Sequence, residues 1–445
     1  MDIYRNYFHI EPEKGLLNDP NGLIQFRGRY YFFHQWNRFA TNHDYKEWGL
    51  FTSVDLLNWD NQGSAILPDS EDDKDGIYSG SATEKDGELF LFYTGNTKKN
   101  GIRKSYQKIS RSVDGQTFIK EKKTIQTPVG FTEHYRDPKV WYHNEKWWMV
   151  IGAQTDRLQG AVALHSSKDL LSWDYEGIFY EDGSLEQMCE CPDVFSVSEG
   201  VDILMVCPQK RSLEDGIDCD LSSFSGYLVG NINYEKRKFI KNKELRPVDH
   251  GFDFYAPQSF LDAKGRRIII GWMSRMGSKE EELCPTKEHG YLHCLTIPRE
   301  MKWRNDKLYQ VPVDEFKQLR KQKEEFFVYS KKIDDIKGAF EMILNLENKM
   351  TDFLLTLHSK TVVIEYKDGL LIISRLNWVS EKYESKCIEL SRLYKIQLFN
   401  DYSAMEIFIN DGEYVFSMRY FSKENIRNIQ YHNFNEKSSI ILYNY

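Results

Sequence analysis

The chain has 445 residues, of which 41% are hydrophobic and 28% are charged, and its formal net charge is -8. This balance predicts a globular protein of two or three domains and excludes a largely disordered chain. The negative charge argues against nucleic acid or a membrane as a partner. Because there is no long apolar run and no secretory signal at the first residues, we expect a cytoplasmic protein.

Seven cysteines lie at irregular spacing along the chain. They predict reduced thiols, because a disulfide framework or a zinc site would require regular pairs. No cluster of His, Cys and Asp has the spacing of metal ligands, so we expect no metal site.

A repeated plan runs through the first 305 residues: a polar turn, a short strand, a charged or Gly-bearing hairpin and an aromatic strand. The turns recur about every sixty residues. They begin at Asn18-Asp-Pro-Asn-Gly, Tyr78-Ser-Gly-Ser-Ala, Arg136-Asp-Pro-Lys, Glu190-Cys-Pro-Asp and Phe254-Tyr-Ala-Pro-Gln. A second element follows the first three turns, at 52–59, 110–118 and 166–173. Five such units predict an all-β fold that begins with a five-bladed β-propeller over 1–305.

The rest of the chain predicts a second module. Residues 306–325 are polar and contain the charge run 317–325, which we interpret as a solvated linker or a short helix. Alternating strands follow over 326–445 and predict a β-sandwich without site chemistry. Within it, 405–416 is predicted to be a hairpin that turns at Asn410-Asp411-Gly412.

Three carboxylates occupy equivalent turns of the repeat: Asp19, Asp137 and Glu190. The first strand of each blade lines the channel of a propeller, so these side chains are expected to converge. Glycoside hydrolysis needs two carboxylates of different proton affinity, about 5–5.5 Å apart when the configuration is retained. The sequence alone leaves retaining and inverting reactions open.

Seven motifs, in order, resemble those of the invertase and fructanase family, glycoside hydrolase family 32. They are the segments 18–22, 78–82, 135–139 and 190–193, then Gly251-Phe-Asp-Phe-Tyr-Ala-Pro-Gln, Ile270-Gly-Trp-Met and Leu295-Thr-Ile-Pro-Arg-Glu. The resemblance extends to 405–413 and so covers nearly the whole chain. It implies a five-bladed propeller with a β-sandwich, retaining release of fructosyl units, and no cofactor.

By this resemblance Asp19 is the nucleophile and Glu190 the general acid/base. Asp137, with Arg136 beside it, would bind fructosyl hydroxyls and stabilise the transition state. The resemblance also implies substrate contacts at Asn18, Gln35, Trp48, Tyr78, Ser79 and Trp272. Leu50 and Tyr78 depart from a frequent His and a frequent Phe, which concerns the leaving-group side of the site.

The segment 43–48 resembles the corresponding loop of bacterial family members that hydrolyse sucrose 6-phosphate. His43 and Lys46 are candidate phosphate partners, because a donor-rich loop favours a dianion, and an ordinary surface loop is the alternative. The expected partner is a small fructoside, sucrose 6-phosphate or sucrose. Alternatives are a fructan-active or fructosyl-transferring member, an inverting arabinanase-like hydrolase, and a silent sugar-binding protein, which the presence of all three carboxylates disfavours. The oligomeric state is not predicted.

Overall fold

The structure is a computed structural model that describes residues 2–100, 102–211, 220–327, 331–334, 336, 338–346, 352–422, 427–434 and 438–445. Its residues fall into two compact units, each built from separate stretches of chain. The propeller unit contains Lys14–Val248 and Tyr255–Trp272. The sandwich unit contains Met1–Glu13, Asp249–Phe254 and Met273–Tyr445.

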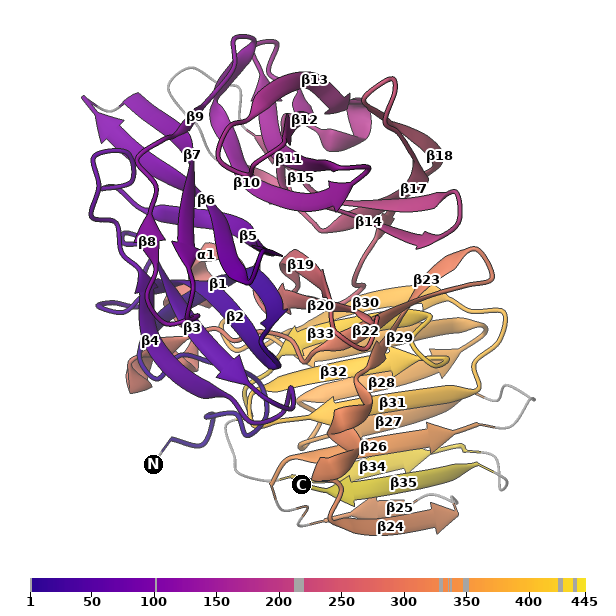
Figure 1. Cartoon of the computed structure of the whole chain (residues 1–445). Helices are drawn as coiled ribbons and strands as arrows, with labels where there is room; N and C mark the ends of the chain where they lie inside the picture. The colour runs from indigo at the N-terminus through magenta and orange to yellow at the C-terminus, as the bar shows by residue number, and fades with distance from the viewer. Residues whose placement is uncertain are drawn as a thin grey trace. The chain divides into compact units, whose positions relative to one another are not determined.

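Successive antiparallel sheets make up the propeller unit (Figure 1). The first pairs β1 (Gly15–Phe26), β2 (Arg29–Asn37), β3 (Glu47–Ser53) and β4 (Asp60–Ile66). The second pairs β5 (Ile77–Lys85), β6 (Glu88–Lys99), β7 (Ile102–Ser112) and β8 (Ile119–Lys120), with β9 (Ile125–Gln126) beside β7. The third pairs β10 (Phe131–His143), β11 (Lys146–Thr155), β12 (Gly160–Ser167) and β13 (Asp174–Tyr180).

The fourth sheet follows the 3-10 helix η1 (Gly183–Leu185). It pairs β14 (Met188–Ser198), β15 (Val201–Arg211), β17 (Gly226–Asn233) and β18 (Lys238–Pro247), with β16 (Asp220–Ser223) beside β15. A final hairpin pairs β19 (Tyr255–Leu261) and β20 (Arg267–Trp272).

The inner hairpins lie where the sequence predicted them, and their turns explain why. Arg27-Gly28, Asp86-Gly87 and Asn144-Glu145 each place two residues at positive φ between paired strands. Two such residues make a turn whose twist matches the twist of the strands. The second strand, which is rich in aromatic residues, therefore pairs antiparallel with the first strand in each of these three sheets.

The first strands of successive sheets lie side by side. Strand β1 contacts β5, β5 contacts β10, β10 contacts β14, β14 contacts β19, and β19 contacts β1. The apolar cores lie between neighbouring sheets: one joins residues of the first and second sheets, a second joins the second and third, and another joins the third and fourth. This arrangement of sheets around a ring of first strands is that of a β-propeller.

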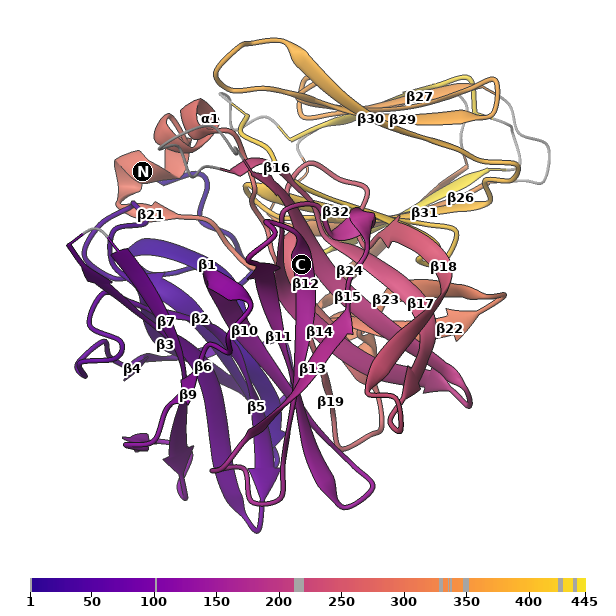
Figure 2. The same cartoon turned by 90° about the horizontal axis from the view of Figure 1, so that it is seen from above.

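The sandwich unit contains two six-stranded antiparallel sheets, which Figure 2 shows as two layers. One sheet pairs, in order, β24 (Gln322–Phe327), β35 (Ser439–Asn444), β26 (Phe340–Asn345), β31 (Lys395–Asn400), β32 (Ala404–Ile409) and β33 (Tyr414–Arg419). The other pairs β25 (Lys331–Ile333), β34 (Ile429–His432), β27 (Phe353–Leu357), β28 (Val362–Lys367), β29 (Leu370–Leu376) and β30 (Tyr383–Glu389). One buried apolar cluster fills the space between them.

Shorter elements complete the sandwich unit. They are α1 (Ser278–Glu282), η2 (Pro285–His289), β21 (Tyr291–Leu292), β22 (Arg299–Arg304), β23 (Lys307–Pro312) and η3 (Asp314–Leu319). The predicted hairpin at Asn410-Asp411-Gly412 is confirmed, since β32 and β33 pair on either side of that turn.

Residues 306–325 are not a simple linker. They contain β23, η3 and the start of β24, and β24 pairs along β35 near the other end of the sequence. A charged stretch becomes a strand here because a distant partner satisfies its backbone, which local composition does not reveal.

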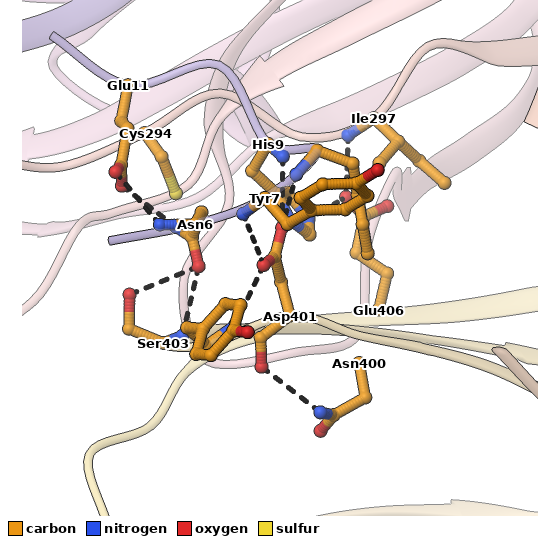
Figure 3. A network of polar contacts seen from close by, with 12 residues as sticks. Asn6, Tyr7, His9, Glu11, Cys294, Ile297, Asn400, Asp401, Ser403 and Glu406 are labelled. Atoms are coloured by element: carbon orange, nitrogen blue, oxygen red, sulfur yellow. Dashed lines mark hydrogen bonds and ion pairs between the residues drawn. The ribbon is translucent and has the colours of Figure 1, made fainter. Parts of the chain in front are cut away.

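The compact units also do not follow the expected ranges 1–305 and 326–445. The N-terminal segment belongs to the sandwich unit, where the backbone N–H groups of Phe8 and His9 donate to Asp401 at 2.9 and 3.0 Å (Figure 3). These contacts join residues almost the whole chain apart, so a repeat found by local pattern could not show them.

The cysteines that the structure describes are free thiols, five of them buried and Cys387 exposed, while Cys219 lies outside the described residues. Among the described parts of the chain, none of the helices has the length and apolar character needed to cross a membrane.

Candidate active site

Asp19 lies on β1 inside the first of two irregular stretches of the strand. The pairing of β1 with β2 shifts register between Leu17 and Pro20 and again between Asn21 and Ile24. Such bulges change the direction of the side chains they carry. The amide of Asn21 donates to the Asp19 carbonyl oxygen at 3.0 Å and so fixes the turn that follows the carboxylate.

A ring of hydrogen bonds surrounds the Asp19 carboxylate. Ser79 Oγ donates to Oδ2 at 2.5 Å, and Asn18 Nδ2 donates to Oδ1 at 3.1 Å. Gln35 joins these two partners, because it accepts from Asn18 at 2.6 Å and donates to Ser79 at 2.8 Å. Neighbouring strands β1, β2 and β5 thus bring together four of the residues that the sequence predicted.

Asp137 and Arg136 lie on β10 at a similar irregularity. Asp137 has a φ of 69°, and the register with β11 shifts between Arg136 and Lys139. The buried Asp137 carboxylate accepts the backbone N–H of Cys191 at 3.0 Å, and its own N–H donates to Thr94 at 2.9 Å. The site carboxylate is therefore held by the turn of the next sheet.

Glu190 on β14 accepts hydrogen bonds at both oxygens. Arg136 donates to Oε1 through Nε at 3.0 Å and through its terminal nitrogen at 2.7 Å. Gln209 Nε2 and the Tyr255 hydroxyl donate to Oε2 at 2.5 and 2.8 Å. Residues from β10, β15 and β19 thus fix this side chain of β14, and the predicted neighbours Arg136 and Glu190 are ion-paired.

The three carboxylates influence one another electrostatically. Burial raises the pKa of Asp19, the charge of Glu190 raises it further, and the hydrogen bonds from Ser79 and Asn18 oppose the rise. Burial also raises the pKa of Asp137 to about 7, an effect that Arg136 opposes and that the charges of Glu190 and Asp19 reinforce. Crowded acids of unequal proton affinity are the arrangement that acid–base catalysis by carboxylates requires.

Lys46 and His43 lie beside this ring. The buried Lys46 ammonium donates to Asn18 Oδ1 at 2.5 Å and lies 2.8 Å from Nδ1 of the exposed His43. The ring of Trp272 stands edge-on to the His43 ring, with centroids 6.2 Å apart. Both residues predicted to bind phosphate are therefore close to the nucleophile candidate, but Lys46 already has a structural partner.

Trp48 and Tyr78 differ in their exposure. Trp48 has no exposed surface, and its indole N–H donates to the Tyr78 carbonyl oxygen at 3.0 Å. The rings of Phe33 and Tyr93 pack beside Trp48, with centroids 5.6 and 5.9 Å away, and its contact with substrate stays a prediction. Tyr78 is half-buried, and its contact with substrate stays a prediction.

Sequence reasoning missed Gln209 and Tyr255. Tyr255 stands two residues before Pro257, as Glu190 stands two residues before Pro192, so the repeat itself carried a signal for Tyr255. Gln209 comes after the second strand of the fourth repeat, 201–206, and no repeated motif marks its position. Only the pairing of Met188 on β14 with Gln209 on β15 brings this amide to Glu190.

Comparison with known proteins defines the class. Residues 9–312 match the model of the glycosyl hydrolases family 32 N-terminal domain, and residues 317–444 match that of the family 32 C-terminal domain. The chain belongs to glycosyl hydrolase family 32, and it is accordingly a glycoside hydrolase.

Its relatives give the particular comparison. The chain is 38% identical over 435 residues to the sucrose-6-phosphate hydrolase of Bacillus subtilis, which covers 94% of this chain and 89% of the relative. It is 36% identical over 427 residues to that of Salmonella typhimurium, with the same coverage of both chains. The solved sucrose-6-phosphate hydrolase of Lactobacillus gasseri superposes with a TM-score of 0.90 at 29% identity, over 100% of this chain and 93% of that one. A Bombyx mori β-fructofuranosidase mutant in complex with sucrose gives a TM-score of 0.83 at 26% identity, over 99% and 94% of the two chains.

Proposed function

We propose that this chain is a retaining β-fructofuranosidase that hydrolyses sucrose 6-phosphate, sucrose or both, and releases a fructosyl unit. The observation that carries the proposal is the meeting of Asp19, Asp137 and Glu190 in one hydrogen-bonded, electrostatically coupled site. The names of the relatives in Bacillus subtilis and Salmonella typhimurium support the choice of substrate.

In this proposal Asp19 attacks the anomeric carbon of the fructosyl unit. Its ring of donors, Asn18 and Ser79, favours the ionised form that attack requires. Glu190 protonates the leaving oxygen, and afterwards takes a proton from the water that releases the fructosyl unit. The Tyr255 hydroxyl at Oε2 can turn from donor to acceptor, so it accommodates both states of Glu190.

Asp137 and Arg136 bind sugar hydroxyls in the same proposal and stabilise the positively charged transition state. Gln35, Tyr78 and Trp272 complete the substrate contacts. His43 and Lys46 would receive the phosphate of sucrose 6-phosphate, and the phosphorylated substrate fits a cytoplasmic enzyme that meets imported sugars. No metal or cofactor takes part.

We also propose five blades for the propeller and the division expected from the sequence, a catalytic domain over 1–305 followed by a module over 326–445. The closed ring of β1, β5, β10, β14 and β19 supports the count of five. The break between the two family models, at 312 and 317, supports a functional boundary in this region.

The test compares leaving groups. Glu190→Gln removes the acid, so we expect kcat/KM on sucrose 6-phosphate and on sucrose to fall by about 10²–10⁴-fold. An activated aryl fructoside needs no protonation, so it should lose far less. The measurement is kcat/KM of wild type and variant on all three substrates side by side.

Two controls accompany this assay. In Asp19→Ala, kcat/KM should fall equally on all three substrates, because no other group can replace the nucleophile. Equal losses for sucrose and the aryl fructoside in Glu190→Gln would contradict the acid role. A first product with inverted anomeric configuration would contradict the retaining mechanism. A wild-type preference for sucrose over sucrose 6-phosphate would contradict the proposed phosphate role of His43 and Lys46.

A further inference from the structure

A Ser-x-Asp turn recurs in the first three sheets, and the catalytic proposal does not use it. It lies at Ser53 and Asp55, at Ser112 and Asp114, and at Ser167 and Asp169, with the same hydrogen bonds each time. In each turn the serine Oγ accepts the N–H of the residue after the aspartate, and that residue has a positive φ. The three turns are therefore structural copies.

The copies differ at the residue that follows the aspartate. Leu56 and Leu170 have φ values of 63° and 70° and fully buried side chains, and Leu170 belongs to the core between the second and third sheets. The left-handed conformation is unfavourable for a leucine, and burial of the leucine side chain offsets that cost. Gly115 takes this position in the second sheet with a φ of 73°, and it brings no side chain.

A cavity lies beside Gly115. A pocket of about 390 Å³ opens between strands β2, β3 and β4 of the first sheet and the loop after β7, and Gly115 is part of its wall. The Tyr31 hydroxyl lies here, only 2.3 Å from where a Cβ of Gly115 would be. The volume of the pocket is in the range of small-ligand sites, about 300–1,000 Å³. We call this cavity the Gly115 pocket.

The lining of the Gly115 pocket is neutral in charge and rich in polar groups. Arg29 pairs with Asp60 at 3.2 Å, so the two charges offset each other while their other donors and acceptors stay available. The side chains of Gln62 and Gln116 add amides, and both residues are exposed. Tyr31 is 7% exposed, and its hydroxyl can donate a hydrogen bond to a molecule in the pocket or accept one from it.

Aromatic and apolar surface completes the wall. Tyr31 and Phe118 present rings, and Leu50 and Ala65 provide aliphatic surface. Rings beside planar amides and a guanidinium–carboxylate pair suit a molecule with an apolar ring face and several hydroxyls around its edge. An anion gains little here because Asp60 neutralises Arg29, and a purely apolar ligand would leave the polar groups unsatisfied.

We propose that the Gly115 pocket is a second saccharide site, which holds one neutral sugar unit away from the catalytic residues. None of its lining residues belongs to the hydrogen-bonded site around Asp19, Asp137 and Glu190. The pocket prefers an unphosphorylated sugar, whereas His43 and Lys46 at the catalytic site are proposed to receive a phosphate. The proposal does not depend on the proposed hydrolysis.

The test counts binding sites in the whole chain. Asp19→Ala, which blocks turnover in the proposed mechanism, is titrated with sucrose and with the trisaccharide 1-kestose by isothermal titration calorimetry. We expect two sites per chain for these neutral sugars. Adding Gly115→Leu, which copies the two sister turns, should remove one site or weaken it at least tenfold. In an otherwise wild-type chain, Gly115→Leu should leave kcat/KM within about twofold.

The matched control is the same Gly→Leu change at another glycine with positive φ that does not line the pocket. Gly87 has a φ of 78° with nothing within 4 Å of its Cβ position, so Gly87→Leu should keep both sites. If Gly115→Leu lowers the melting temperature too far to be titrated, the double variant Tyr31→Phe/Gln116→Ala takes its place and should weaken the second site at least tenfold. A single site in Asp19→Ala that survives Gly115→Leu, or a second site that survives these changes, overturns the proposal. A chain that shows the second site but hydrolyses no fructoside would overturn only the proposed function.

Discussion

Lys46 has a position that gives it two separable roles. Its buried ammonium donates to Asn18, and Asn18 in turn donates to the Asp19 carboxylate. The charge of Lys46 also lowers the pKa of Asp19, against the burial that raises it. The same ammonium was predicted from the sequence to bind a phosphate. One role concerns the proposed nucleophile, Asp19, on any substrate, and the other concerns only phosphorylated sugars.

Lys46→Met keeps the length of the side chain and removes its charge. The pKa of Asp19 should rise, so the acid limb of the pH profile of kcat/KM should move to higher pH on sucrose as well as on sucrose 6-phosphate. We expect a loss on both sugars that grows as the pH falls, of about tenfold at the acid end. The measurement is kcat/KM against pH for the two sugars.

Lys108 provides the matched control. It is buried to a similar degree and pairs with Asp72 at 3.2 Å, away from the Asp19 ring. Lys108→Met should leave the acid limb where it is in wild type. A loss in Lys46→Met that is confined to sucrose 6-phosphate and has the same size at every pH would leave Lys46 as a phosphate partner only.

At the scale of strands, bulges decide where the carboxylates point. The register between first and second strands shifts at Leu17–Pro20, Arg136–Lys139, Glu190–Asp193 and Tyr255–Gln258. Proline stands inside or at the end of each irregular stretch, where a missing N–H does no harm to the ladder. Side chains of a regular strand alternate between its two faces, and the repeated X-Pro turns interrupt this alternation at the carboxylates.

The sequence predicted these turns but not their consequences in space. Motif order was sufficient to predict that Asp19, Asp137 and Glu190 lie close together, because each lies at a repeated position, and their roles in catalysis stay predictions. It was insufficient for Gln209 and for the linker region, where the partner comes from another strand or from the far end of the chain. Periodicity is a local property, whereas these contacts depend on which strands pair.

Gly152 shows how closely the strands of two sheets approach beside Glu190. A Cβ at Gly152 on β11 would lie 2.3 Å from the Cys189 carbonyl oxygen and 3.2 Å from the Glu190 Cα on β14. Gly152→Ala should therefore push the segment that carries Glu190 away. Because a displacement of about 1 Å costs about 10²-fold in rate, we expect kcat/KM to fall by about that factor, with a stability loss of about 1–3 kcal/mol.

The measurement is kcat/KM together with the melting temperature, and Gly183→Ala is the control, since nothing lies within 4 Å of its Cβ position. The loss on an activated aryl fructoside should be smaller than on sucrose, because Glu190 is the displaced group. Normal activity in Gly152→Ala would mean that the β14 segment adapts without moving its carboxylate.

For the chain as a whole, a buried charged cluster in the sandwich unit connects the first residues to the last sheets (Figure 3). His9 contacts Asp401 through Nδ1 at 3.0 Å and Glu406 through Nε2 at 3.1 Å. Glu406 also pairs with the buried Arg299 at 2.6 Å, and Arg299 pairs with Asp249 at 3.0 Å. Segments from four parts of the sequence therefore depend on one set of charges.

The pKa shifts in this cluster give it a defined pH range. Burial alone would lower the pKa of His9, but its bonds to Asp401 and Glu406 outweigh burial and raise it. Burial would raise the pKa of Asp401, but the hydrogen bond and charge of His9 hold it below its usual value. Burial would likewise raise the pKa of Glu406, but Arg299 and His9 hold it below its usual value. The histidine contribution is complete below about pH 6.5 and is lost as the pH rises through its raised pKa. The carboxylate contributions are complete above about pH 4.5 and are lost as the pH falls.

His9→Gln should therefore destabilise the protein most between about pH 4.5 and 6.5, where wild type holds all three charges. Loss of one partner of a buried charged cluster costs about 3–5 kcal/mol, so we expect the melting temperature to fall by several degrees at pH 6. Between pH 6 and pH 9 the wild-type histidine loses charge as the pH rises toward and through its raised pKa, so the difference between variant and wild type should shrink. The exposed His432 serves as the control, since His432→Gln should change little at either pH. Equal losses for His9→Gln at pH 6 and pH 9 would mean that His9 acts by packing and neutral hydrogen bonds, and that charge does not hold the N-terminal segment in place.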